Sequence, residues 1–72
     1  MSSDKHPSIG KLAWLYLGRE LPLEILRSAN GYYLGTSENH QPVSRESIEY
    51  FRSRSAAETA LHNGTWTQRI TP

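Results

Sequence analysis

The Asn30–Gly31 dipeptide restricts the fold of this 72-residue chain more than any other feature of its sequence. Both residues tolerate the positive φ angles of a type I′ turn, and Asn-Gly between apolar segments is the strongest short-range sign of a β-hairpin. Residues 23–28 and 32–37 flank the turn with the apolar and aromatic side chains that suit strands. We therefore expect a hairpin at the centre of the fold.

The two-residue turn would also set the register of the strand before it. If Asn30 and Gly31 form the two-residue turn, Ser28 lies opposite Tyr33 and Leu26 lies opposite Gly35. A helix over 22–30 is the alternative, because Pro22 suits the first turn of a helix and glycine suits the residue after its end.

Composition limits the classes of protein to consider. Seventy-two residues make one domain at most, and 36% hydrophobic residues give it a small core. Eight basic and seven acidic residues are interspersed, with a net charge of +1, which is not the pattern of a strong nucleic-acid binder. The chain has no cysteine, so disulfides and thiolate zinc sites are excluded. The apolar run at 12–17 is too short to span a membrane, and we expect a cytoplasmic protein with no membrane partner.

The remaining segments complete an α+β expectation. Residues 1–8 are polar and predict a flexible tail, and 9–70 predict a single domain. The run 12–17 is apolar throughout, which favours a strand but leaves a helix of fewer than two turns open. A polar loop at 38–42 and alternation over 45–52 predict a third strand.

One short helix is expected near the C-terminus. Ser55 and Glu58 have the spacing of a capping box, and Gly64 suits a helix stop after about residue 62. Trp66 would return under this helix, and 68–70 would form a short strand or extended tail. The expected fold is therefore α+β, with a small antiparallel sheet of three or four strands and one short helix packed on one face.

Nothing in the chain matches a catalytic template, so we expect no enzyme and no cofactor. The sequence has no nucleophile elbow, zinc-protease, phosphate-loop or dinucleotide motif. The three histidines, His6, His40 and His62, lack the spacing of metal ligands and fall in a tail, a loop and a helix end. His62 suits the carbonyl end of a helix.

A non-catalytic module that binds another protein is the function we expect, through strand edges and uncovered aromatic side chains. In the polar cluster Ser44-Arg45-Glu46-Ser47, Arg45 could bind phosphate or carboxylate in bidentate fashion, but polar turn chemistry explains most clusters of this kind. The alternative is a weak nucleic-acid binder that stacks bases on a sheet face and places arginines on phosphates. The candidate binding surface combines the following residues: Arg27, Tyr33, Arg45, Glu46 and Arg69.

Part of the chain, residues 31–69, shows a longer pattern. It consists of Gly31-Tyr32-Tyr33-Leu34-Gly35-Thr36, Ser44-Arg45-Glu46-Ser47, Tyr50-Phe51, Ala57, Ala60-Leu61, Gly64 and Trp66-Thr67-Gln68-Arg69. This pattern resembles a family of short bacterial proteins of unknown function. The resemblance implies a small stand-alone bacterial protein, and it implies no activity, ligand or site residue.

Overall fold

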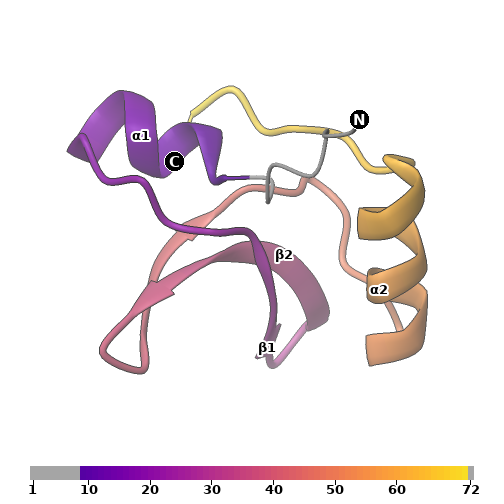
Figure 1. The fold of residues 1–72 in the computed structure, drawn as a ribbon. Helices are drawn as coiled ribbons and strands as arrows, with labels where there is room; N and C mark the ends of the chain where they lie inside the picture. The colour runs from indigo at the N-terminus through magenta and orange to yellow at the C-terminus, as the bar shows by residue number, and fades with distance from the viewer. Residues whose placement is uncertain (1–8, 72) are drawn as a thin grey trace, which may run out of the picture.

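The structure is a computed structural model that describes residues 9–71. Figure 1 shows a three-stranded antiparallel sheet between two helices, in the chain order α1 (Lys11–Leu17), β1 (Glu24–Ser28), β2 (Gly31–Glu38), β3 (Gln41–Arg45) and α2 (Arg54–Asn63). The α+β class is therefore confirmed, with two helices instead of the single one expected. The predicted tail at 1–8 lies outside the described residues.

The central hairpin is confirmed, but its register is not the predicted one. β1 and β2 pair with Ser28 opposite Gly31 and Leu26 opposite Tyr33, two residues away from the expected partners. The turn consists of Ala29 and Asn30, and the positive φ of 126° falls on Gly31 inside the pair. A side chain at Gly31 would place its Cβ 2.8 Å from the backbone oxygen of Phe51. The hairpin therefore needs glycine because another segment packs against it.

The type I′ geometry occurs in the second hairpin, where it was not expected. Asn39 and His40 have φ angles of 53° and 65° and connect Glu38 to Gln41. Asparagine and histidine enter this left-handed region more readily than most residues, so the chain reverses there and β3 begins at once. The predicted third strand at 45–52 is wrong, because β3 ends at Arg45.

The segment after β3 continues beside β2 in the same antiparallel direction, but with irregular pairing instead of a regular strand. The backbone N–H groups of Glu46 and Ser47 both donate to the carbonyl of Leu34, at 2.8 and 3.0 Å. Phe51 then pairs with Tyr32 through two backbone hydrogen bonds of 2.7 and 2.9 Å. Residues 46–51 are therefore held against the middle and the start of β2.

The apolar run at 12–17 forms helix α1, so the preferred strand interpretation is wrong and the helical alternative is correct. Gly18 adopts the left-handed conformation after the helix, with φ 67°. The N–H groups of Gly18 and Arg19 bond back to the carbonyls of Trp14 and Ala13. Such a glycine ends a helix at little cost because it has no Cβ to clash.

Helix α2 is confirmed, but its cap differs from the prediction. Ser53 is the N-cap, and its hydroxyl accepts a hydrogen bond of 3.0 Å from the N–H of Ala56. The predicted capping partner Glu58 instead lies 3.6 Å from Arg54, one turn earlier on the exposed face. The stop at Gly64 is as expected, with φ 68°.

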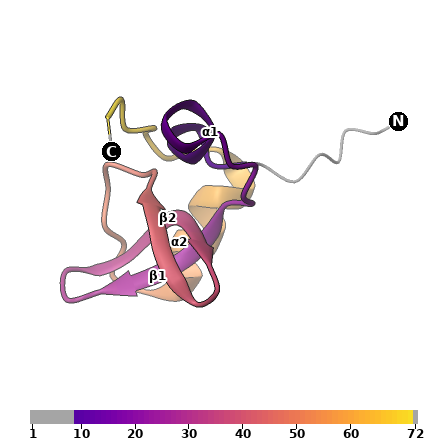
Figure 2. The same ribbon diagram turned by 90° about the vertical axis from the view of Figure 1, so that its left-hand side faces the viewer.

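The core lies between the helices and the strongly curved sheet (Figure 2). Its apolar members are Leu12, Ala13, Tyr33, Leu34, Ala57 and Ala60. The alanines of α2 let that helix approach β2 and β1 closely. Because successive residues of a strand face opposite sides, both faces of β2 are covered over its middle residues, which are all buried.

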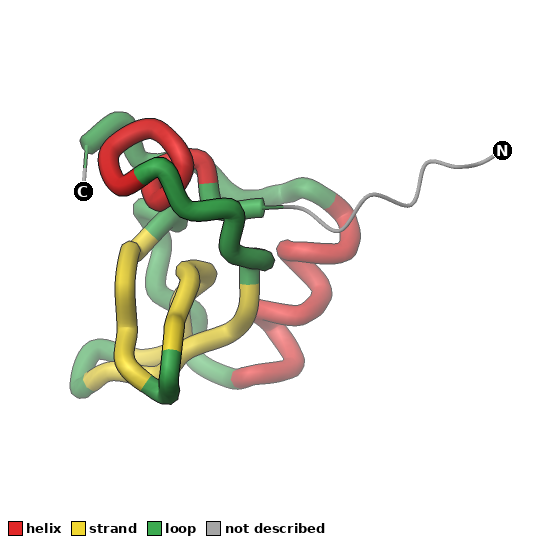
Figure 3. Tube along the Cα trace, turned by 60° about the vertical axis from the view of Figure 1, so that its left-hand side comes forward, coloured by secondary structure: helices red, strands yellow, loops and turns green. Residues whose placement is uncertain are grey.

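The C-terminal segment crosses the molecule from α2 to α1, as Figures 1 and 3 show. Gln68 bridges to Ser47, and the N–H of Arg69 donates to the carbonyl of Glu46 at 2.7 Å. The extended tail expected at 68–70 is therefore present, and it ends beside α1.

Gly18 and Gly31, two of the three glycines with positive φ, differ in their surroundings, which gives a matched test of the hairpin. Gly18→Ala meets no atom within 4 Å and should cost only the left-handed strain, about 1 kcal/mol. Gly31→Ala adds a clash with the backbone of Phe51, and we expect a loss of about 2–3 kcal/mol. Urea denaturation of both variants measures the difference, and equal losses would contradict the close approach of Phe51.

Candidate functional site

The five residues predicted to form a binding surface are distributed over different environments. Glu46 and Tyr33 are buried, Arg45 and Arg69 are half-buried, and Arg27 is exposed. The two buried side chains offer nothing to a partner, so the predicted surface does not exist as one face. Their structural contacts explain why.

The carboxylate of Glu46 is fully buried and receives hydrogen bonds from the adjacent end of β3 and from two distant segments. The N–H of Leu12 donates to its Oε1 and Oε2 atoms at 2.9 and 3.1 Å, and the N–H of Ala13 donates to Oε2 at 3.1 Å. The Ser44 hydroxyl donates at 2.5 Å and the Gln68 amide at 2.8 Å. Glu46 therefore caps α1 from outside the helix and joins it to β3 and to the C-terminal segment.

The close approach at this carboxylate requires a glycine before α1. A Cβ atom at Gly10 would lie 2.3 Å from Cγ2 of Thr36 and 2.7 Å from Oε2 of Glu46. The hydroxyls of Thr36 and Ser44 are 2.7 Å apart, and the Ser44 hydroxyl donates onward to Glu46. Every oxygen at this site thus has a partner, as a buried polar group requires.

Two opposing effects act on the pKa of Glu46. Burial alone would raise it, because a low-dielectric environment disfavours the charged carboxylate. The hydrogen bonds from Leu12, Ser44, Gln68 and Ala13 favour the charged form and together hold the pKa below its ordinary value. The group is therefore a structural carboxylate that stays ionised, not a proton donor at neutral pH.

Arg45 also has a structural role, because its guanidinium binds the segment that follows β3. Its Nε atom donates to the carbonyl of Ser47 at 3.0 Å, one Nη donates to the carbonyl of Ile48, and the other donates to the Tyr50 hydroxyl at 2.8 Å. Its guanidinium carbon also lies 4.1 Å from the centre of the Tyr50 ring. The N–H donors of Arg45 are thus hydrogen-bonded to residues 47–50.

Tyr50 in turn covers Tyr33, with the two rings edge to face and 6.1 Å apart. Burial raises the pKa of Tyr33, Tyr50 adds to this shift, and Arg45 opposes it. The sheet face that was expected to expose aromatic side chains is therefore closed by the segment after β3.

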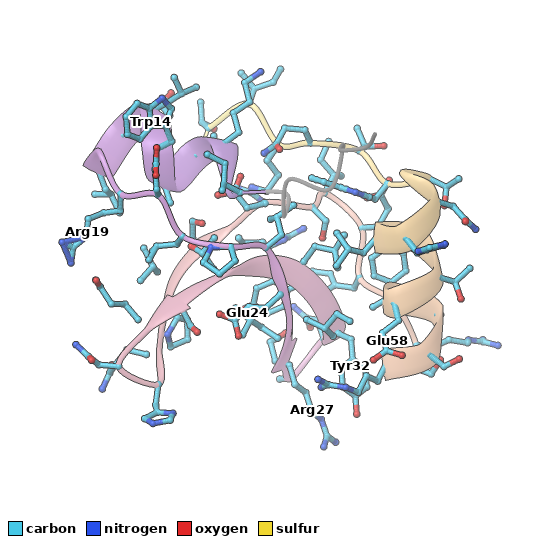
Figure 4. The ribbon with its side chains drawn as sticks, viewed as in Figure 1. Trp14, Arg19, Glu24, Arg27, Tyr32 and Glu58 are labelled. Carbon is cyan, nitrogen blue, oxygen red and sulfur yellow. The ribbon has the colours of Figure 1, made fainter. Side chains whose placement is uncertain are left out.

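Arg27 and Arg69 lie apart from this cluster. Arg27 projects from β1 beside Tyr32, 5.6 Å from the ring centre (Figure 4). Arg69 donates to the carbonyl of Thr71 at 3.2 Å and lines a shallow hollow with Ile48, Ile70 and Thr71. Each arginine stands near a different end of the fold.

The exposed residues that the sequence interpretation missed are on α1. Leu12 and Ala13 in its first turn are buried, whereas Trp14, Leu15, Tyr16 and Leu17 are each 47–60% exposed. Figure 4 shows Trp14 pointing away from the sheet. We call residues 14–17 the α1 knob. The sequence signal was the unbroken apolar run itself, which was interpreted as a buried strand.

Polar groups border the α1 knob. Arg19, just beyond the helix, forms an ion pair with Glu38 at the end of β2, and both side chains remain partly exposed. The ion pair holds the chain that leaves α1 against the second hairpin. The α1 knob therefore projects from a helix whose C-terminal end is anchored to the sheet.

Between residues 9 and 71, no three histidine or acidic side chains gather in a way that could hold a metal ion. No helix in that range is long and apolar enough to cross a membrane.

Replacing Glu46 tests its role as an external cap. Glu46→Gln keeps the size of the side chain but turns one acceptor into a donor that faces other donors. We expect a loss of about 2 kcal/mol or more in the free energy of unfolding. Glu58→Gln is the control, because it affects only an exposed pair with Arg54 and should cost less than about 0.5 kcal/mol. Equal losses would show that Glu46 caps nothing.

The same carboxylate should make stability depend on pH in acid. A folded-state pKa below the unfolded value means that the contribution of Glu46 is complete above the ordinary glutamate pKa of about 4.3 and is lost as the pH falls below it. Urea midpoints between about pH 7 and pH 3 should therefore fall more steeply for the wild type than for Glu46→Gln. Parallel curves for the two proteins would contradict the lowered pKa.

Comparison with known proteins gives no indication of what this chain does. No family model, curated protein or solved structure matches the chain. The resemblance of residues 31–69 to short bacterial proteins therefore stays an expectation. The α1 knob is the feature of the described structure that most requires a functional explanation.

Proposed function

We propose that this protein is a small, non-catalytic cytoplasmic module that binds another protein chain through the α1 knob. The observation that carries the proposal is the exposure of four consecutive large apolar side chains, Trp14 to Leu17, on one short helix. Scattered apolar residues are normal on a protein surface, but a contiguous apolar patch marks an interaction site.

The size of this patch supports the proposal. If each of the four side chains has about the 150–250 Å² of an aromatic side chain, half exposure leaves roughly 300–500 Å² open. The largest apolar patch on a typical monomer covers about 300–600 Å² and is often functional. The knob reaches that range on a molecule whose total accessible surface is 4964 Å².

The composition of the knob also favours a protein partner. Tryptophan and tyrosine dominate the binding energy of protein interfaces because they combine a large apolar area with a polar group. The residues before and after it include both charge signs, with Lys11 on one side and Arg19 and Glu20 on the other. A mixed border of this kind does not attract phosphate backbones, which require clustered positive charge.

The nucleic-acid alternative receives less support from the geometry. It relied on Tyr33 for stacking and on Arg45 for phosphate contact, and these two side chains are committed to Tyr50 and the 47–50 segment. Arg27 beside Tyr32 is the part of that surface that remains accessible.

A comparative pull-down tests the proposed function. Tagged wild-type protein should recover a protein from the source cells with or without nuclease, and Leu15→Glu should lose it because a charge in an apolar interface is costly. Thr59→Glu adds the same charge to exposed α2 on the opposite side of the molecule and should bind like the wild type.

Circular dichroism of the three proteins first establishes that each is folded. A partner retained by Leu15→Glu would place the binding surface elsewhere. A complex that disappears with nuclease would replace the proposal with the nucleic-acid alternative, and its affinity would then fall steeply with salt.

A further inference from the structure

The dipeptide Asn-Gly occurs twice in this chain, and the fold places its two copies in different conformations. Asn30 belongs to the two-residue turn between β1 and β2. Asn63 is the last residue of helix α2, directly before Gly64. The third asparagine, Asn39, precedes a histidine in the other hairpin turn. All three asparagines are exposed, so solvent access does not distinguish them, and the same dipeptide can be compared in a turn and at the end of a helix.

An asparagine that precedes a glycine has a chemical reaction available within its own backbone. The glycine nitrogen attacks the side-chain carbonyl carbon of the asparagine, a C–N bond closes a succinimide ring, and the side-chain nitrogen leaves as ammonia. Water then opens the ring at either carbonyl, which leaves aspartate or isoaspartate. Glycine allows this reaction best because it has no Cβ beside the attacking nitrogen. Base promotes the reaction because the nitrogen has to lose its proton, and asparagine is among the thermolabile residues of proteins.

We propose that Asn30 is a site of spontaneous modification in the folded protein, at which water converts the side-chain amide to aspartate and isoaspartate while Asn63 keeps its amide. The reaction needs no partner other than water, because the attacking nitrogen belongs to Gly31. This inference is independent of the proposed function, since it concerns the hairpin of β1 and β2 and not the α1 knob.

The surroundings of Asn30 allow it to reach the reacting conformation. Ala29 and Asn30 are exposed at the tip of the hairpin. The N–H of Asn30 donates to the Ser28 hydroxyl at 3.2 Å, at the long end of the range for such bonds. Gly31 pairs with Ser28 in the last pair of the ladder, next to the turn. Exposed ends of a structure open locally at low free-energy cost. The Gly31 nitrogen can therefore turn toward the side chain of Asn30 without unfolding the sheet.

The conformation of Asn63 opposes the same reaction. Asn63 is part of α2, and a helix fixes the backbone dihedral angles that would have to change for the ring to close. The N–H of Gly64 donates to the carbonyl of Ala60 in the left-handed cap of this helix. The Gly64 nitrogen has to break that hydrogen bond before it can lose its proton and attack. The end of α2 therefore protects Asn63, although its sequence is as reactive as that of Asn30.

Modification at Asn30 has a structural consequence because the hairpin beside it is closely fitted. Isoaspartate carries the main chain through its side-chain carbon, so it inserts an additional backbone carbon into the turn. The length of the turn fixes the register of the two strands. Gly31, directly after the turn, lies against the backbone of Phe51. The isoaspartate product should therefore displace Gly31 from this contact and destabilise the hairpin, whereas the aspartate product keeps the length of the turn and adds only a charge.

Peptide mapping of the full chain by mass spectrometry tests the site. One sample is incubated folded at mildly alkaline pH, and a second is incubated unfolded in guanidinium chloride. In the unfolded sample Asn30 and Asn63 should be converted at similar rates, and Asn39, which no glycine follows, should be the slow reference. In the folded sample conversion of Asn63 should slow severalfold, and Asn30 should give most of the product. A folded protein in which Asn30 keeps its amide, or is converted no faster than Asn63, would overturn the proposal.

Two variants separate the modification from its consequence, and circular dichroism first establishes that both are folded. Asn30→Ser keeps a residue that suits turns but has no amide, so incubation should leave its urea midpoint unchanged. Asn30→Asp carries the charge of the product without the additional backbone carbon, and its midpoint should lie near that of fresh wild-type protein. Incubated wild-type protein should contain a less stable fraction that carries isoaspartate. An equal loss of midpoint in incubated Asn30→Ser would assign the change to another position and overturn the role of Asn30.

Discussion

The buried carboxylate of Glu46 is the interaction on which the rest of this structure depends. It joins residues 34 positions apart, because its oxygens accept the free N–H groups at the start of α1. A seven-residue helix is not stable alone in water, and the first N–H groups of any helix need acceptors. By supplying them from β3's end, Glu46 docks α1 at its N-terminal half. The C-terminal half is left outside, and the α1 knob is the result.

The balance of forces at Glu46 explains why a charge is tolerated there. Among residues 9–71, no cation pairs with this carboxylate. Burying an ion costs several kcal/mol unless hydrogen bonds replace the lost water. Two backbone N–H groups, a hydroxyl and an amide replace it here, and the positive end of a helix adds to their effect. Glu46, which the sequence suggested as part of a binding surface, thus holds together segments of the fold.

The aromatic side chains around Arg45 likewise stabilise the fold. A domain of this size has few large side chains, and Tyr33 and Tyr50 are used to close one sheet face. Arg45 fixes the chain that carries Tyr50 by bonding its backbone. The exposed apolar surface is consequently displaced from the sheet, where it was expected, to the helix that precedes it.

The sequence by itself determined the features that depend on neighbouring residues. The two hairpin strands, the helix before Gly64 and the absence of thiol chemistry follow from turn residues, side-chain periodicity and composition. Tertiary structure decided the rest. Gly31 lies inside the β1–β2 pair, against the backbone of Phe51, instead of in the turn, and the N–H groups at the start of the apolar run bond to Glu46 from another segment. Residues 46–51 run irregularly beside β2 because Glu46 and Ser47 share the carbonyl of Leu34 and Arg45 binds the carbonyl of Ser47. The contacts of Gly31 with Phe51, of Glu46 with α1 and of Leu34 with residues 46 and 47 join positions far apart in the chain, so no local pattern contains the information that selects them.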